Sequence, residues 1–240
     1  KPNPEDPVAF KAMLARLTDT LVWAAKIDMN DLLQKKKIQS KPSPLKSPSL
    51  ARAADKIIAI GASTGGAEAL RNIMPLLPPT TPGILIVQHM PEHFTHSFAQ
   101  RLDQMSQIEV KEAEDGDEVY PGRALLAPGD HHMRLKNKNG KYVVDIVKGP
   151  LVSRHRPSVD VLMQSVADIA GAEGVGVMLT GMGNDGAKGM LSMRDRGART
   201  IAQSEETCVV FGMPREVLNN GGAETAVPLS DIVSKLMSLV

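Results

Sequence analysis

The chain has 240 residues, of which 42% are hydrophobic and 23% are charged, and its formal net charge is only +1. This balance is typical of a globular protein with a large core, and it excludes a strongly basic nucleic-acid-binding surface. The sequence lacks the roughly 18 consecutive apolar residues of a transmembrane helix and the apolar core of a signal peptide. The single cysteine, Cys208, cannot form an internal disulfide, which favours a cytoplasmic location.

The first 55 residues differ in character from the rest. The chain starts at Lys1 and not at a methionine, which favours a fragment or a processed product. Apolar residues recur at helical spacing over residues 6–27, which predicts an amphipathic helix. Residues 34–55 are rich in Lys, Ser and Pro, a composition typical of a semi-extended linker without a core. A second interpretation, in which this basic segment binds an acidic partner, stays open.

From residue 56 onward, short apolar runs alternate with helical patterns. The predicted elements are strand 57–60, helix 67–77, strand 84–87, helix 94–105, strand 175–179, helix 186–196, strand 200–202 and a terminal helix starting near residue 229. This alternation predicts an α/β fold with a mostly parallel, doubly wound sheet of the Rossmann type.

The middle of this region has another pattern. Extended runs at 123–127, 132–135 and 142–147 surround Asn139-Gly140, a dipeptide typical of a tight hairpin turn. We therefore expect an antiparallel hairpin insertion in the mostly parallel sheet. Ser158 follows a proline and is predicted to be the N-cap of the next helix.

Three predicted strands end in turns that carry the side chains of a hydrolytic site. The turns are GASTGG at 61–66, QHMP at 88–91 and TGMGNDG at 180–186. Ligands of open parallel sheets bind beyond the carboxyl ends of the strands, so Ser63, His89 and Asp185 are expected to lie together. These residue types are the nucleophile, general base and orienting acid of a serine hydrolase. Taken alone, Asp185 is a weak signal, because an aspartate at this place can also be a turn residue or the N-cap of the next helix.

The glycine-rich turn at 61–66 allows two other interpretations. Its backbone N–H groups suit a nucleotide phosphate, and the turn also suits a plain strand-to-helix connection without a ligand. A dinucleotide site needs G-x-G-x-x-G and an acidic residue about 20 positions on. Here the glycine spacing differs, the next strand ends in Gln88-His89, and no Gly-Lys-Ser/Thr of a P-loop follows. We therefore expect no cofactor.

The remaining histidines form no metal-binding pattern in the sequence. His93 and His96 lie at the predicted start of a helix, without a His-Glu-x-x-His motif or paired cysteines. His131, His132 and His155 fall in predicted loops, where the sequence pairs them with no other group. We therefore expect no metal.

Longer motifs at the same positions make the chain similar to a known family. The motifs are IGASTGG at 60–66, VQHMP at 87–91, LAPGDHHM at 126–133, RPSVDVL at 156–162, LTGMGNDGAKGM at 179–190, TIAQSEETCVVFGMP at 200–214 and AVPL at 226–229. In these motifs, residues 56–240 resemble the chemotaxis protein-glutamate methylesterase family, CheB.

The resemblance implies a serine hydrolase without a cofactor, in which Ser63 is the nucleophile, His89 the general base and Asp185 the orienting acid. It also implies an oxyanion site formed by the backbone N–H groups of Thr64 and Met182. The implied reactions are methanol release from glutamate methyl esters of chemoreceptors and deamidation of receptor glutamines. The implied partners are cytoplasmic receptor helices and, through a receiver domain of the full-length protein, the histidine kinase of the chemotaxis pathway. We expect no nucleic-acid binding and no membrane insertion.

The resemblance also divides the chain into parts. Residues 1–33 look like the C-terminal helix remnant of a receiver domain, residues 34–55 like the linker, and residues 56–240 like the catalytic domain. An unrelated N-terminal helix is the alternative for the first part. Two alternative functions also stay open. One is a non-catalytic domain that binds a nucleotide or phosphorylated ligand at Gly61–Gly66, and the other is a docking module that uses the helix and the basic linker.

Overall fold

The computed structural model of the chain describes Thr18 and residues 55–240. Apart from Thr18, the helix predicted over residues 6–27 and the receiver remnant lie outside the described residues, as does the Lys/Ser/Pro-rich linker up to residue 54. The predicted catalytic domain, residues 56–240, lies within them.

The domain is built on a seven-stranded sheet with the strand order β3-β4-β2-β1-β7-β8-β9. The strands are β1 (Ile57–Ala62), β2 (Gly83–Gln88), β3 (Glu109–Glu112), β4 (Arg123–Leu126), β7 (Gly174–Met178), β8 (Arg199–Gln203) and β9 (Thr225–Val227). Every neighbouring pair in this sheet is parallel. The predicted α/β class with a parallel, doubly wound sheet is confirmed.

Both faces of the sheet are covered, which explains the apolar sequence of its central strands. All residues of β1 and β2 are buried. Because successive side chains of a strand point to opposite faces, Ile57 and Ala59 pack in one core cluster and Ile58 and Ile60 in the other. Strands buried on both sides read as continuous apolar runs, and this is the signal that predicted them.

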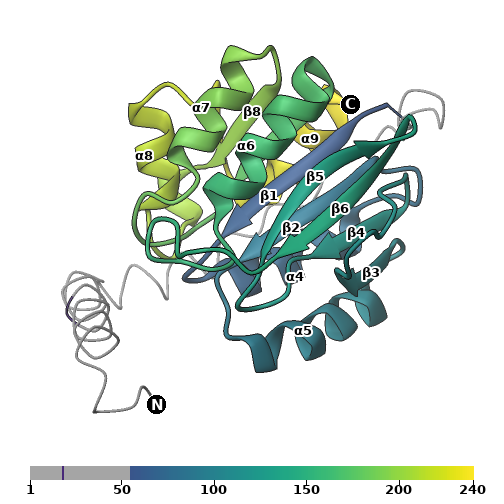
Figure 1. Cartoon of the computed structure of the whole chain (residues 1–240). Coiled ribbons are helices and arrows are strands. Elements are labelled where there is room, and N and C mark those ends of the chain that lie inside the picture. Colours follow the sequence, from purple (N-terminus) through teal and green to yellow (C-terminus); the bar gives the residue numbers. More distant parts are fainter. Residues whose placement is uncertain (1–17, 19–54) are drawn as a thin grey trace. The chain divides into compact units, whose positions relative to one another are not determined.

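Helices cover the two faces of the sheet. One core cluster contains residues of α4 (Gly66–Ile73), α5 (Glu92–Met105) and α9 (Ile232–Leu239). The other contains residues of α6 (Val159–Ala170), α7 (Ala187–Asp195) and α8 (Met213–Asn219), and Figure 1 shows α6 and α7 in front of the sheet. Short 3₁₀ turns lie at Met74–Leu76, Gly171–Glu173, Glu205–Thr207 and Leu229–Asp231. No helix among the described residues is both long and apolar enough to cross a lipid bilayer.

The predicted hairpin is present as a separate two-stranded sheet of β5 (His132–Lys138) and β6 (Lys141–Val147). Its turn is at Asn139-Gly140, where both residues have positive φ, as such a tight turn requires. Residues 123–127, predicted with the hairpin, behave differently, because β4 runs parallel between β2 and β3. The hairpin packs on the face of the sheet that α6 covers.

The glycine in the turn between β1 and α4 cannot be replaced without strain. Gly65 has a φ of 81°, and a Cβ built on it would lie 2.5 Å from the Cβ of Val209. We expect Gly65→Ala to lower the free energy of unfolding by about 2–5 kcal/mol, from the left-handed backbone and the overpacking together. Urea unfolding followed by circular dichroism measures this loss.

Gly116→Ala is the matched control for this prediction. Gly116 has a φ of 84°, and a Cβ there would meet nothing within 4 Å. This variant should lose only the backbone part, about 1–2 kcal/mol. Equal losses in the two variants would show that the contact with Val209 adds no strain.

Candidate active site

The candidate site lies where the direction of strand addition reverses. From β1 the chain adds β2, β3 and β4 on one side, and β7, β8 and β9 on the other. Ligands of such sheets bind in the crevice at this switch point, outside the carboxyl ends of the strands. Ser63, His89 and Asp185 follow β1, β2 and β7, the three strands at this point. The structure therefore brings the three predicted residues to one edge of the sheet.

Backbone hydrogen bonds continue past the strand ends and hold the three turns together. The N–H of His89 donates to the carbonyl of Ala62 over 3.0 Å, and the N–H of Ser63 donates to the carbonyl of Thr180 over 3.1 Å. Ala62 and Gln88 are the last paired residues of β1 and β2, so Ser63 and His89 are the next residues in register. The serine and the histidine thus start from neighbouring positions of one rigid sheet.

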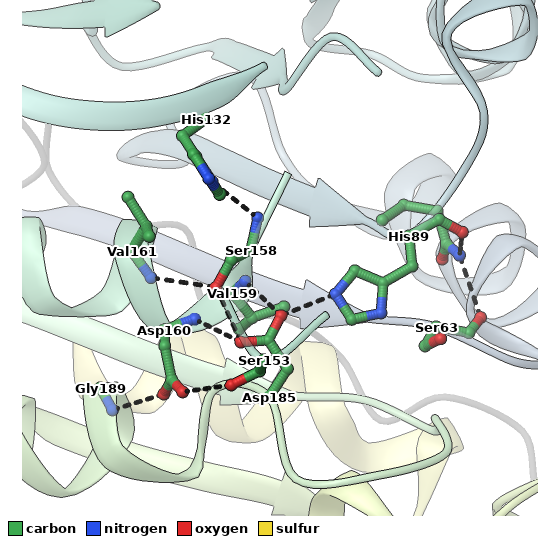
Figure 2. A network of polar contacts seen from close by, with 11 residues as sticks. Ser63, His89, His132, Ser153, Ser158, Val159, Asp160, Val161, Asp185 and Gly189 are labelled. Atoms are coloured by element: carbon green, nitrogen blue, oxygen red, sulfur yellow. Dashed lines mark hydrogen bonds and ion pairs between the residues drawn. The ribbon is translucent and has the colours of Figure 1, made fainter. Parts of the chain in front are cut away.

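His89 and Asp185 form a buried hydrogen-bonded pair. Nε2 of His89 lies 2.8 Å from Oδ2 of Asp185, and the side chains are 9% and 2% exposed (Figure 2). Because an ionised carboxylate only accepts hydrogen bonds, Nε2 carries the hydrogen and Nδ1 keeps its lone pair. Nδ1 is buried with no hydrogen-bond partner among the described residues, and Figure 2 shows it on the side of the ring toward Ser63. The ring therefore offers a proton acceptor on the serine side.

The N-terminus of α6 holds the carboxylate of Asp185 in place. The hydroxyl of Ser158 donates to Oδ1 over 2.8 Å, and the N–H groups of Val159 and Asp160 donate to Oδ2 and Oδ1 over 2.8 and 3.1 Å. Ser158 also caps α6 by accepting from the N–H of Val161, so its prediction as N-cap is confirmed. The free N–H groups and the positive end of the helix dipole stabilise the negative charge of Asp185.

These contacts keep Asp185 ionised. Burial by itself raises the pKa of the Asp185 carboxyl. The hydrogen bond and charge of His89, together with the N–H groups of Val159 and Asp160, outweigh burial and hold this pKa below its ordinary value. The carboxylate is therefore charged at neutral pH, as a partner of an imidazolium must be.

A second histidine supports Ser158 from behind. The N–H of Ser158 donates to Nδ1 of His132 over 3.2 Å (Figure 2). Nε2 of His132 lies 2.9 Å from the carbonyl of Pro150. Since a carbonyl only accepts, Nε2 of His132 carries the hydrogen, and the ring is neutral. His132, where the predicted extended run 132–135 begins, is the buried first residue of β5, so the hairpin is linked to the carboxylate through Ser158.

Two backbone N–H groups near Ser63 are available to an anion. Within residues 55–240, the N–H groups of Thr64 and Met182 form no hydrogen bond. The carbonyl of Gly181 accepts from the N–H groups of Gly212 and Met213 over 3.1 and 2.8 Å, which fixes the loop before Met182. Both N–H groups thus belong to anchored turns that flank the serine, the arrangement that an oxyanion site requires.

The sequence did not place two residues at this site that the structure puts there, Ser158, which was predicted only as a helix N-cap, and His155. Ser158 contacts Asp185, although they are 27 positions apart, and the ring centroid of His155 lies 3.7 Å from that of His89. No spacing signals either contact, because both depend on how the loop before α6 returns over the sheet edge. His93 and His96 lie on α5, and among the described residues they join no cluster with His89.

The fold is that of an α/β protein with a parallel sheet, and Ser63, His89 and Asp185 are the residue types of a serine-hydrolase site. The chain belongs to the CheB methylesterase family, which matches residues 58–236. This confirms the resemblance noted in the sequence.

Curated relatives agree with this family. A protein of Escherichia coli (strain K12) named protein-glutamate methylesterase/protein-glutamine glutaminase is 51% identical over 98% of this chain and 65% of its own length. A protein of Dechloromonas aromatica (strain RCB) is named protein-glutamate methylesterase/protein-glutamine glutaminase 2. It is 57% identical over 76% of this chain and 51% of its own length. The chain thus spans about half to two thirds of the length of these relatives.

A solved structure supports the same fold. The catalytic domain of the Thermotoga maritima CheB methylesterase superposes on this chain with a TM-score of 0.75 and 46% sequence identity. The match covers 77% of this chain and 98% of that domain. The parallel sheet with its added hairpin is therefore the fold of this family's catalytic domain.

Proposed function

We propose that this chain is a serine hydrolase that removes methyl groups from glutamate methyl esters of chemoreceptors, releasing methanol, and that deamidates receptor glutamines. The reaction serves adaptation in bacterial chemotaxis and takes place in the cytoplasm. The observation that carries the proposal is the His89–Asp185 pair, whose free Nδ1 lies on the side toward Ser63. The names of the relatives support the choice of substrate.

The first step is attack by Ser63. Its Oγ bonds to the side-chain carbonyl carbon of the glutamate ester while Nδ1 of His89 accepts the hydroxyl proton. Asp185 stabilises the imidazolium through the hydrogen bond to Nε2–H. The carbonyl oxygen becomes an oxyanion, which the N–H groups of Thr64 and Met182 stabilise.

The second step breaks the methyl ester and then the acyl-enzyme. The C–OCH₃ bond breaks, and the proton on Nδ1 of His89 passes to the leaving oxygen, which gives methanol. A water molecule then attacks the ester between Ser63 and the glutamyl group, with His89 again accepting and returning the proton. The products are a glutamate side chain and the free Ser63 hydroxyl. With a glutamine substrate, the leaving group is ammonia.

The partners follow from the same proposal. The substrate is a cytoplasmic helix of a methyl-accepting chemoreceptor, and the histidine kinase acts through a receiver domain in the full-length protein. Residues 1–33 are the remnant of that receiver domain, residues 34–55 the linker and residues 56–240 the catalytic domain. Membership of the CheB methylesterase family favours this hydrolase over the nucleotide-binding and docking interpretations.

The test is methanol release from a methylated chemoreceptor fragment, with ammonia release from the same fragment carrying glutamine as a second readout. The chain should release both products, and its Ser63→Ala variant should release neither. A folded chain that releases no methanol from methylated fragments of several receptors would contradict the proposal. Protection of that chain by nucleotides against thermal unfolding would then favour the phosphate-binding alternative.

The bond from Ser158 to Asp185 gives a prediction for this reaction. Ser158→Ala removes one hydrogen bond to an ionised carboxylate, a contact worth about 1.5–3 kcal/mol. If that contact is needed to orient the imidazole, we expect kcat to fall by about 10- to 100-fold, with a small change in KM. Initial rates of methanol release measure both constants.

Ser165→Ala is the matched control on the same helix. The hydroxyl of Ser165 bonds the carbonyl of Leu162 and accepts from the N–H of Leu135, but among the described contacts it does not touch Asp185. We expect it to lose stability without losing kcat. Equal losses of kcat in both variants would mean that Ser158 acts only through the stability of α6.

A further inference from the structure

We propose that His89, His155 and Asp185 form a binding site for a divalent transition-metal ion such as Zn²⁺, and that the bound ion blocks the hydrolase. The binding part stands on the geometry alone, whereas the inhibition part rests on the proposed function. One atom from each of the three residues, two imidazole nitrogens and one carboxylate oxygen, lies within 4.8 Å of the other two. Two imidazoles and a carboxylate with an open fourth position are typical Zn²⁺ ligands.

The loop that carries His155 is built to hold it at this place. Ser153 and Arg154 have φ values of 49° and 66°, a left-handed conformation that costs free energy for residues other than glycine. Two backbone hydrogen bonds of 2.8 and 3.1 Å between Val152 and His155 close this tight turn. Arg156 fixes the other end through a 3.0 Å bond to Asp130.

The turn places the His155 ring against the His89 ring. The centroids are 3.7 Å apart and the planes are tilted by 47°. The tilt turns the rings away from a parallel stack. Ligand atoms around a tetrahedral Zn²⁺ are about 3.3 Å apart, so a small rotation of the His155 side chain brings its nitrogen within range. The strained turn therefore holds the His155 imidazole against the candidate base, His89. Metal binding would give this strain a function.

Asp185 is already arranged as a metal ligand. Its hydrogen bonds from Ser158, Val159 and Asp160 leave the Oδ2 position toward His89 for one further partner. Groups that orient a ligand in this way strengthen metal binding. A divalent cation would take the place of the hydrogen between Oδ2 and Nε2 of His89.

Occupancy of this site would stop catalysis by a change of tautomer. A metal ion binds the lone pair of a ring nitrogen, so Nε2 of His89 must give up its hydrogen. The hydrogen moves to Nδ1, which then has no lone pair to accept the proton of Ser63. The step needs no oxidant, reductant or further reactant, and chelation of the ion reverses it.

Calorimetric titration with Zn²⁺ tests the binding part. All six histidines of the chain lie at residues 89 to 155, so histidine variants cover every imidazole. The metal-free full chain should bind one Zn²⁺. His155→Gln and Asp185→Asn should each weaken binding at least tenfold, as expected for loss of a direct ligand. His96→Gln is the matched control, because His96 is exposed and lies outside the cluster.

Three results of this titration would contradict the proposed metal site. Absence of Zn²⁺ binding, unchanged affinity in His155→Gln, or an equal loss in His96→Gln would overturn the proposed site. Circular dichroism of each variant shows that it is folded, and Asp185→Asn tests the same site if His155→Gln does not fold. Two variants are used so that one unfolded protein does not decide the result.

Methanol release at increasing Zn²⁺ concentration tests the inhibition part. Each protein is compared with its own metal-free rate, and EDTA should restore that rate. His155→Gln should need at least tenfold more Zn²⁺ for half-inhibition than the unmodified chain. Zn²⁺ binding without inhibition would overturn this part. A chain that binds Zn²⁺ but never releases methanol would contradict the proposed function and leave the metal site supported.

Discussion

Ser63→Ala is expected to lower the turnover of a glutamate methyl ester by about 10⁶-fold while leaving the fold intact. Loss of the nucleophile in a comparable triad has an effect of this size, because no other group can form the acyl-enzyme. The small rate that remains would come from binding and from the N–H groups of the oxyanion site. Initial rates of methanol release from a methylated receptor fragment measure the effect.

The structure explains why this variant should fold normally. The backbone of Ser63 makes the local contacts, since its N–H donates to Thr180 and its carbonyl accepts from the N–H of Gly66 and the amide of Gln88. Alanine keeps this backbone and the Cβ. The melting temperature should therefore change little, which separates a chemical defect from unfolding.

Ser97→Ala is the matched control for the loss of a serine hydroxyl. Ser97 lies on α5, and its hydroxyl bonds only the carbonyl of Phe94 in the described contacts. This variant should keep its rate. Near-normal turnover in Ser63→Ala would show that Ser63 is not the nucleophile, whatever the position of His89 and Asp185.

Asp185→Asn is expected to lower kcat by up to about 10⁴-fold, the effect of the same change in the well-studied triad. The amide NH₂ can donate to Nε2 of His89, which forces the hydrogen of the ring onto Nδ1. The proton acceptor that faces Ser63 is then lost. A loss below about tenfold would assign Asp185 a structural role only.

The same variant should also be less stable, because the groups around residue 185 at the N-terminus of α6 are hydrogen-bond donors that need an acceptor. The hydroxyl of Ser158 and the N–H groups of Val159 and Asp160 all donate to the carboxylate. An amide nitrogen among these donors leaves buried groups unpaired, at about 1–3 kcal/mol. Asp168→Asn, an exposed change that breaks the ion pair to Arg196 and leaves an amide oxygen to accept from Gln164, should cost less than 1 kcal/mol.

The difference in free energy of unfolding between the unmodified chain and Asp185→Asn should depend on pH in one direction. The pKa of the Asp185 carboxyl is lower in the folded chain than its ordinary value. Its contribution to stability is therefore complete above the unfolded pKa of about 4 and is lost as the pH falls through the folded pKa. The gap in free energy of unfolding between the unmodified chain and Asp185→Asn should shrink below about pH 5. A gap that grew with acidity would contradict the lowered pKa.

Much of this architecture could be predicted because its signals are local. Continuous apolar runs marked β1, β2 and β7, and glycine-rich turns marked their carboxyl ends. Since parallel strands end on one edge, the neighbourhood of Ser63, His89 and Asp185 followed from chain topology. The hairpin turn at Asn139-Gly140 and the N-cap at Ser158 were also predictable, because each depends on the backbone preferences of one or two residues.

The remaining features depend on tertiary contacts that leave no local pattern. β3 (Glu109–Glu112) is short, polar and half-exposed, and β9 has three residues, so neither gives a strand signal. The direction of β4 is set by its neighbours β2 and β3, not by its own sequence. The bond from Ser158 to Asp185 and the placement of His155 on His89 both depend on the path of one loop over the sheet edge.

The use of Nδ1 as the proton acceptor has a mechanical consequence. Nδ1 is bonded to Cγ, close to the backbone, whereas Nε2 lies at the outer edge of the ring and moves further when the side chain rocks. Here the outer edge is held by Asp185, and the inner edge lies on the side toward Ser63. Ser63 and His89 follow the last paired residues of two adjacent strands. The distance that the proton crosses between Ser63 and Nδ1 of His89 therefore depends on the strand spacing of about 4.8 Å. This spacing is one of the least variable lengths in proteins.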